Sequence, residues 1–189
     1  MLLSLKRDSN VRDFLMQKFP DSANNFLSWI IISLVFCVLL AAFVAPYIPV
    51  IPAKVRELQF FGYELNKFGF SLAAILIFYW VRNLVSYLFY AGTGSLKKWH
   101  IFYFKISKFY FCISILLMVL CVLNYFYTLD ETRAFEIYFV GFSVLFVFKL
   151  TYYLSHRNNI LPPKWYYKFL YICTLQIVPV LVLWKVLFF

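Results

Sequence analysis

The segment FLSWIIISLVFCVLLAAFVA, residues 26–45, has twenty consecutive residues and no charged side chain among them. An α-helix of about 20 residues crosses the roughly 30 Å hydrocarbon core of a bilayer. Four further apolar runs follow it in the chain, at residues 70–91, 101–127, 134–155 and 166–188. We therefore predict an all-α fold, a polytopic membrane helix bundle with five transmembrane helices. The bundle would occupy residues 26–189, after a cytoplasmic tail over residues 1–25.

The composition of the chain supports this class of protein. Of its 189 residues, 64% are hydrophobic, 23% are aromatic and only 14% are charged, and the mean hydropathy is +0.80. A soluble domain of this length cannot bury that much apolar surface, so lipid must solvate the rest. The apolar runs do not alternate with polar residues, as the strands of a membrane β-barrel would.

The distribution of Lys and Arg predicts the orientation of the bundle. With the N-terminus in the cytoplasm, eleven basic residues fall on the inner side and five on the outer side. The positive-inside rule therefore favours an N-in, C-out topology. We interpret the net charge of +10 as this bias together with attraction to anionic phospholipids, and not as a sign of nucleic-acid binding.

The N-terminal tail has the pattern of an amphipathic interfacial helix. Val11, Phe14, Leu15 and Phe19 recur at helical spacing, with charged and polar residues between them. Such a helix lies on the membrane surface with its apolar face in the lipid. A solvated tail is the alternative interpretation.

The sequence contains no recognisable catalytic, metal or cofactor motif. The single cysteines are scattered along the predicted spans, and both histidines, His100 and His156, fall at span ends. The carboxylates all lie in the tail, in loops or in the first turn of the fourth span, whereas membrane-embedded hydrolases and proton pumps place an acid near mid-membrane. We therefore expect a protein that is not an enzyme and holds no cofactor.

The most pronounced polar feature inside the spans is a stripe on the second helix. Its members recur at intervals of three and four residues, which places them on one helix face. They are Tyr79, Arg82, Asn83, Ser86, Tyr87 and Tyr90. An arginine this deep costs at least ~2.5 kcal/mol to insert, so it must face protein, water or a lipid phosphate.

Two main interpretations of the stripe stay open, and a contact with a partner protein is a third. In one, Arg82 ties the bundle together through hydrogen bonds to tyrosine hydroxyls, amide oxygens and helix-end carbonyls. In the other, Arg82 and Lys149 of the fourth span bind a lipid phosphate, because guanidinium suits phosphate bidentately. Lys149 could instead extend to the nearby membrane surface.

Two further groups of residues are candidates for a role in the membrane. Pro179 removes a backbone donor from the fifth span and predicts a kink beside Gln176, where a cavity could form. Lys97, Lys98, Lys105 and Lys108 lie at the start of the third span and are predicted to contact lipid headgroups.

The segment FLYICTLQIVP, residues 169–179, resembles the closing signature of domain-of-unknown-function family 4271, small integral membrane proteins of Bacteroidota. The resemblance runs from about Asn25 to the end of the chain. Family members tend to carry Glu where this chain has Gln176, which argues against an essential ionised group there. The resemblance implies no assigned activity, only an association with envelope and polyprenyl-phosphate-sugar biosynthesis.

Two functions are consistent with these observations. The first is a non-enzymatic subunit of the bacterial inner membrane that anchors or scaffolds an envelope-biogenesis complex with a membrane-protein partner. The alternative is a small transporter or lipid-handling protein that binds an anionic lipid phosphate or polyprenyl phosphate at the Arg82 face.

Overall fold

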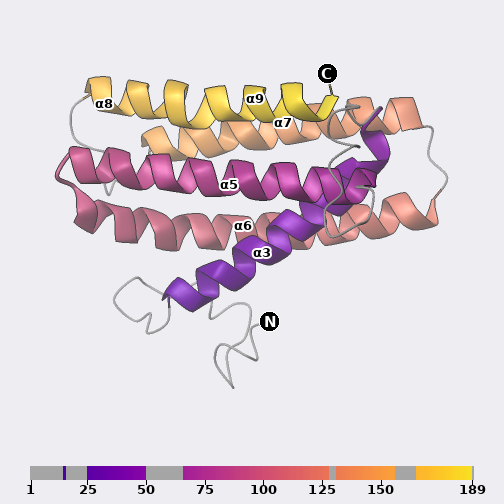
Figure 1. The fold of residues 1–189 in the computed structure, drawn as a ribbon, viewed down its shortest axis with the longest axis horizontal. Helices are drawn as coiled ribbons and strands as arrows, with labels where there is room; N and C mark the ends of the chain where they lie inside the picture. The colour runs from indigo at the N-terminus through magenta and orange to yellow at the C-terminus, as the bar shows by residue number, and fades with distance from the viewer. Residues whose placement is uncertain (1–14, 16–24, 50–65, 128–130, 156–164, 189) are drawn as a thin grey trace.

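The computed structural model describes Leu15 and residues 25–49, 66–127, 131–155 and 165–188. Within these ranges, apart from short turns and ends, the chain is helical and contains no strand. The elements, in chain order, are α3 (Asn25–Val44), the 3-10 helix η2 (Ala45–Tyr47), α5 (Lys67–Gly92), α6 (Leu96–Phe126), α7 (Glu131–Ser155), α8 (Trp165–Leu170), the π-helix η3 (Tyr171–Ile177) and α9 (Val178–Phe188). The last three follow one another as one helix (Figure 1).

Five of these helical segments are long and apolar enough to cross a membrane, which confirms the predicted number of spans. The main difference in bounds is at α6, which begins at Leu96, five residues before the predicted start. The turn between α5 and α6 is therefore very short. Gly94 makes it possible, because its φ of 66° is a conformation that residues with a side chain rarely adopt.

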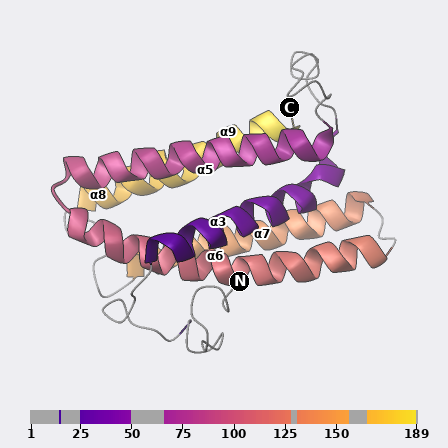
Figure 2. The same ribbon diagram turned by 60° about the horizontal axis from the view of Figure 1, so that its bottom comes forward.

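The helices form two layers. α5 and α9 lie side by side in one layer, and α3, α6 and α7 lie in the other (Figures 1 and 2). α3 crosses its neighbours obliquely and packs most extensively against α6, while it also contacts α5. Arg82 of α5 and Lys149 of α7 thus come from opposite layers.

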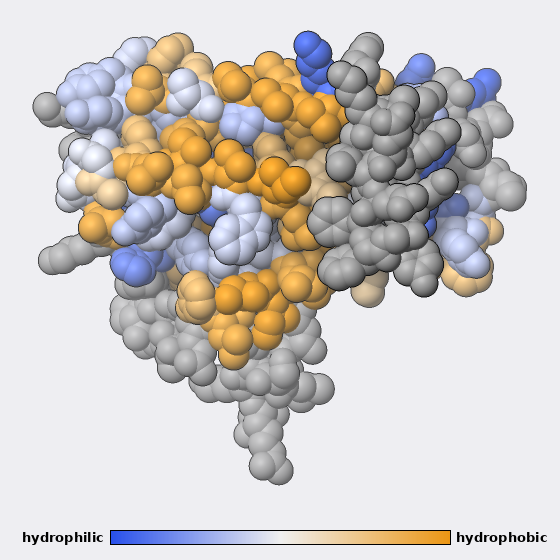
Figure 3. All heavy atoms as spheres, viewed as in Figure 1, coloured by the Kyte–Doolittle hydropathy of each residue, from blue (hydrophilic) through white to orange (hydrophobic). Residues whose placement is uncertain are grey.

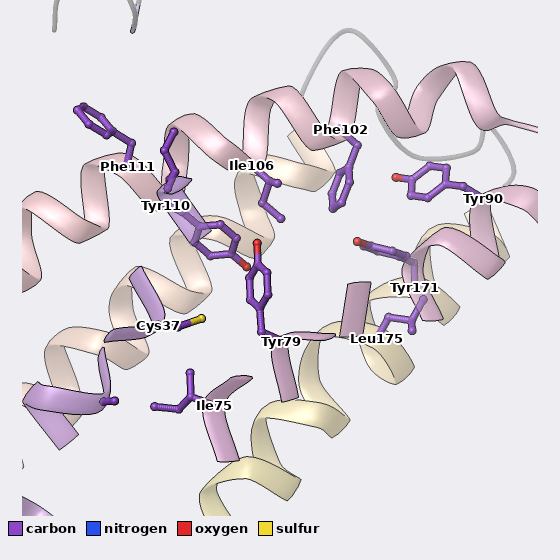
Figure 4. Close-up of a cluster of buried hydrophobic side chains, with 12 residues drawn as sticks. Cys37, Ile75, Tyr79, Tyr90, Phe102, Ile106, Tyr110, Phe111, Tyr171 and Leu175 are labelled. Atoms are coloured by element: carbon purple, nitrogen blue, oxygen red, sulfur yellow. The ribbon is translucent and has the colours of Figure 1, made fainter. Parts of the chain in front are cut away.

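The core of the bundle is largely aromatic. Tyr79 and Tyr110 point their hydroxyl groups toward each other from α5 and α6 (Figure 4). The rings of Tyr90 of α5 and Tyr171 of η3 are also in contact, with centroids 6.0 Å apart. The Tyr90 and Tyr171 side chains are fully buried. Lipid supplies no hydrophobic driving force between helices, so close packing and buried hydrogen bonds of this kind hold such a bundle together.

The outer surface of the bundle is apolar. Orange, apolar residues dominate the middle of the described face in Figure 3, with strongly hydrophilic residues mostly toward the helix ends. Exposed side chains include Trp80, Leu84, Val144 and Leu181, all at least 57% exposed. A contiguous surface of this size in water would be a binding or aggregation site, whereas in a bilayer it is the lipid-facing side.

The helix α7 is the least buried of the five spans. Only 11% of its most apolar window is buried inside the protein, against 22% to 33% in the other four. Near its first turns it is held by ring contacts, including Phe139 with Trp184, whose centroids are 5.0 Å apart, and Tyr138 with Phe43, also at 5.0 Å. Large aromatic side chains of α7 thus reach across the space between α7 and the neighbouring helices.

Most of the predicted N-terminal interfacial helix lies outside the described residues. Leu15 is the exception: it is helical and exposed. Its backbone carbonyl accepts a hydrogen bond of 2.8 Å from the Lys108 Nζ of α6. This contact joins the tail to the third span.

Candidate functional site

Arg82 lies at the centre of a hydrogen-bonded network inside the bundle. Its Nη1 donates to the Tyr110 hydroxyl of α6 at 2.6 Å, and its Nη2 donates to Oε1 of Gln176 in η3 at 2.8 Å. Both distances are typical of charge-assisted hydrogen bonds. Arg82 therefore joins three helices, in agreement with the bundle-tying interpretation of the stripe.

The π-helix positions Gln176 for this contact. Gln176 is 1% exposed, and its Nε2 donates to the hydroxyl of Tyr171, five residues earlier, at 3.0 Å. In a π-helix the backbone bonds run from residue i to i+5, so these two side chains fall on the same face. The Val178 N–H bonds to the Cys173 carbonyl in this manner, directly before Pro179.

Besides Arg82, three members of the predicted stripe are buried, namely Tyr79, Ser86 and Tyr90, and Tyr87 is not. The Tyr79 hydroxyl is hydrogen-bonded to Ser33 of α3, and Asn83 is half-buried. Ser86 is buried. Tyr87 is 48% exposed and packs against Trp99, so it faces away from the network. The six stripe positions together cover an arc of the helix that is too wide to be buried entirely, and Tyr87 lies at the edge of that arc.

Lys149 points into the bundle instead of toward the membrane surface. It is only 7% exposed, and its Nζ lies 5.6 Å from the centroid of the Phe109 ring and 5.3 Å from that of Tyr110. Tyr110 thus contacts both basic residues, since it also accepts from Arg82. Two basic side chains that share one aromatic neighbour repel each other when both are charged.

Arg82 and Lys149 line the same cavity, which has a volume of about 440 Å³. The cavity extends between α7 and the helices α3, α5, α6 and α9. Its described walls are otherwise mainly apolar and aromatic, and none of the described lining residues is acidic. Aromatic residues from α7, η2 and the ends of α3 and α9 form much of the wall away from the two basic residues: Phe43, Tyr47, Phe135, Tyr138, Phe139, Phe142, Trp184 and Phe188.

The remaining candidates lie outside this cavity. Gln176 does not line the cavity, but it is hydrogen-bonded to Arg82, which does. Pro179 does not line the cavity either. Lys98, Lys105 and Lys108 are half-buried near the start of α6, while the side chain of Lys97 is not among those described. The described part of the chain also holds no group of three His, Cys, Asp or Glu placed to bind a metal ion.

Three network residues do not belong to the predicted site: Ser33, Tyr110 and Tyr171. For Tyr110 a signal exists in the sequence, because Tyr103, Ser107, Tyr110 and Ser114 recur at intervals of four, three and four. That spacing defines a polar stripe on the third span. Ser33 has no such companion and lies in an almost featureless apolar helix.

The fold and the network define the class of this protein: a multi-pass helical membrane protein with a largely apolar, partly open cavity that two basic side chains line. The chain belongs to the family described as Domain of unknown function (DUF4271), whose model matches residues 5–187. Comparison with curated proteins and with solved structures gave no match.

Proposed function

We propose that this protein binds an anionic lipid inside its helix bundle, with Arg82 and Lys149 at the headgroup. One observation carries the proposal: two basic side chains from different helices line one cavity whose other described walls are mainly apolar. An anion between them would offset their mutual repulsion. The apolar walls would contact the hydrocarbon part of the same molecule.

The chemistry of the two basic residues suits a phosphate or carboxylate. Charge-assisted bonds from a guanidinium are among the strongest hydrogen bonds in proteins, and an ammonium acts as a point charge beside them. Tyr110 and Gln176 fix the position of the Arg82 guanidinium, so little conformational entropy is lost when an anion binds.

The depth of the site agrees with a ligand that comes from one leaflet. At 1.5 Å per residue, Arg82 lies about 15 Å from the end of α5 at Gly92, and Lys149 lies about 9 Å from the end of α7 at Ser155. Both ends are on the same side of the bundle (Figure 1). We propose that this side faces the cytoplasm of a bacterial inner membrane, because the positive-inside rule, applied to the Lys and Arg residues between the spans and before the first span, favours this orientation.

Native mass spectrometry of the full-length protein in mild detergent tests the proposal. Wild type should retain an anionic lipid, and Arg82→Gln should lose it while elution in size-exclusion chromatography is unchanged. Arg133→Gln is the matched control, because Arg133 is an exposed arginine near the other end of α7. Equal retention by wild type and Arg82→Gln, or none by wild type, would contradict the proposal.

The same spectra address the role as an anchor or scaffold that the sequence also predicts. A scaffold would carry a membrane-protein partner in a fixed stoichiometry. That role would not depend on Arg82, so the two functions give different results in the Arg82→Gln variant.

A further inference from the structure

The helix α7 carries one of the two basic residues of the cavity and much of the cavity wall. Lys149 lies on it, and its lining residues extend from Phe135 to Lys149. Among the described helices no other contributes as many residues to the lining. Movement of α7 away from the bundle would therefore open the cavity to the surrounding lipid and separate Lys149 from Arg82.

α7 is also the least closely packed of the five spans. Hydrogen bonds from side chains connect α3, α5, α6 and η3 with one another, for example Ser33 of α3 with Tyr79 of α5. On α7 the hydroxyls of Ser143 and Thr151 donate to carbonyls of α7 itself. The backbone of α3 packs closely on α5 and α6, and that of α5 on α6 and α9, whereas the backbone of α7 packs on no other described helix to the same extent.

The contacts that α7 does make are concentrated in its first half. Its ring contacts with other described helices all involve residues 135–142. Phe135 packs against Phe188 of α9 and Phe142 against Phe43 of α3, in both cases with centroids 5.5 Å apart. In the second half, Lys149 has two rings of α6 as neighbours. The first half is thus anchored on two sides by aromatic packing that the second half lacks.

A helix segment with few buried contacts can leave a bundle at low cost in a bilayer. Lipid tails are as apolar as the side chains that they replace, so packing and hydrogen bonds are what hold membrane helices together. Segments with few such contacts open at a lower free energy than the rest of a fold. Residues 143–151 of α7 are such a segment, and they end at the basic residues of the cavity.

We propose that α7 is a lateral gate of the cavity. Its second half moves away from α6 to admit a lipid from the bilayer, while the ring contacts of residues 135–142 keep the first half in place. The gate closes when the headgroup bridges Arg82 and Lys149, because a ligand that contacts both residues favours the state in which they share one cavity. The inference rests on the proposed function and adds the helix that controls access to the site.

Spin labels on exposed cysteines measure the movement itself. One pair is Phe148→Cys of α7 with Ile115→Cys of α6, and the matched pair is Ile137→Cys with Val122→Cys on the same two helices. All four side chains are at least 43% exposed, so the labels leave the core intact. The native cysteines are replaced beforehand.

Distances between the labels are measured by double electron–electron resonance on the full-length protein in phosphatidylcholine nanodiscs. The distribution for the 148–115 pair should be broad and should narrow when phosphatidylglycerol is included as an anionic probe. The distribution for the 137–122 pair should be narrow in both lipids. Equally narrow and unchanged distributions for the two pairs would overturn the gate.

A tether across the same pairs tests whether this movement admits the lipid. A short bis-methanethiosulfonate reagent joins the two cysteines through disulfides that a reductant breaks. Exchange of bound phosphatidylglycerol for a deuterated copy is followed by native mass spectrometry. The 148–115 tether should slow the exchange at least about tenfold, and reduction should restore it. The 137–122 tether is the control and should leave the exchange rate unchanged.

The outcomes separate the gate from the proposed function. If wild type retains phosphatidylglycerol and Arg82→Gln loses it, but the 148–115 tether leaves the exchange unchanged, the binding site stands and the gate is wrong. If wild type retains no anionic lipid, the proposed function fails, and the gate fails with it because it has no ligand to admit.

Discussion

The side-chain amide of Gln176 donates to the hydroxyl of Tyr171, five residues earlier in the same helix, while its oxygen accepts from Arg82. Regular α-helical spacing brings residues three or four apart together, so this pair depends on the π-helix between Tyr171 and Ile177. The π-helix thus orients the side-chain amide of Gln176 so that its oxygen accepts from Arg82.

Removal of the Tyr171 hydroxyl should destabilise the bundle. In Tyr171→Phe the Gln176 N–H loses its acceptor in a place that is 1% exposed, at a cost of about 1 to 3 kcal/mol. Thermal unfolding in detergent measures this change. Tyr125→Phe is the control, because Tyr125 is 86% exposed and its hydroxyl faces lipid or water. Equal stability of the two variants would show that the Gln176–Tyr171 bond contributes nothing.

A carboxylate beside Arg82 should compete with an anionic ligand. Gln176→Glu keeps the shape of the side chain and the contact with Arg82. The new carboxylate forms an ion pair with the guanidinium and so offsets its positive charge. We expect a folded protein whose affinity for the anionic lipid, read from its retention in native mass spectrometry, is at least about tenfold lower. Asn66→Asp makes the same chemical change at the exposed N-cap of α5, where Asp is as good a cap as Asn, and should leave the affinity unchanged. Unchanged affinity in Gln176→Glu would argue that Arg82 does not contact the ligand.

Truncation of a side chain should destabilise the protein on the buried side of α6 but not on its exposed side. Leu117 is fully buried and Leu116 is 40% exposed. In a bilayer the unfolded helix is already in an apolar solvent, so the cost of Leu117→Ala comes from the lost packing contacts and not from transfer out of water. We expect a loss of about 2 kcal/mol for Leu117→Ala and a much smaller one for Leu116→Ala, measured by unfolding in mixed micelles. Similar losses would mean that α6 buries a different face.

The predicted orientation can be checked by cysteine labelling of intact cells. A cysteine at Ser95, in the turn between α5 and α6, should react with a membrane-impermeant maleimide only after permeabilisation. A cysteine at Tyr127, at the other end of α6, should react without it. The native cysteines are replaced by Ala or Ser beforehand, since Cys112 is exposed. The reverse pattern would place the N-terminus outside.

The number and approximate bounds of the membrane helices could be read from the sequence, because each run of about 20 apolar residues has one stable conformation in lipid. The face of α5 that carries Arg82 could be read as well, since 3.6-residue periodicity places Tyr79, Arg82 and Ser86 together. Periodicity did not indicate which of the neighbouring positions would be buried. Tyr87 lies at the edge of that arc and is exposed.

The fifth span shows why some partners could not be predicted. Regular α-helical spacing groups Tyr171 with Thr174 and Val178, both of which are exposed in the structure. Instead Leu175 and Gln176 are buried together with Tyr171. The π-helix shifts the register by part of a turn, and it forms next to Pro179, which provides no backbone N–H. The sequence shows the position of the proline but does not show that a π-helix accommodates it.

The sequence by itself determined that this chain is a set of five apolar helices with an arginine that has to avoid lipid, because hydropathy and helical periodicity are local properties. Only the tertiary structure decided that Arg82 meets Tyr110 and Gln176, 28 and 94 positions away, and shares a cavity with Lys149. Those contacts depend on how the helices pack, which is set by the fit of buried side chains from all five. The apolar faces that insert the helices into the bilayer are alike, so they carry little information about which helix lies next to which.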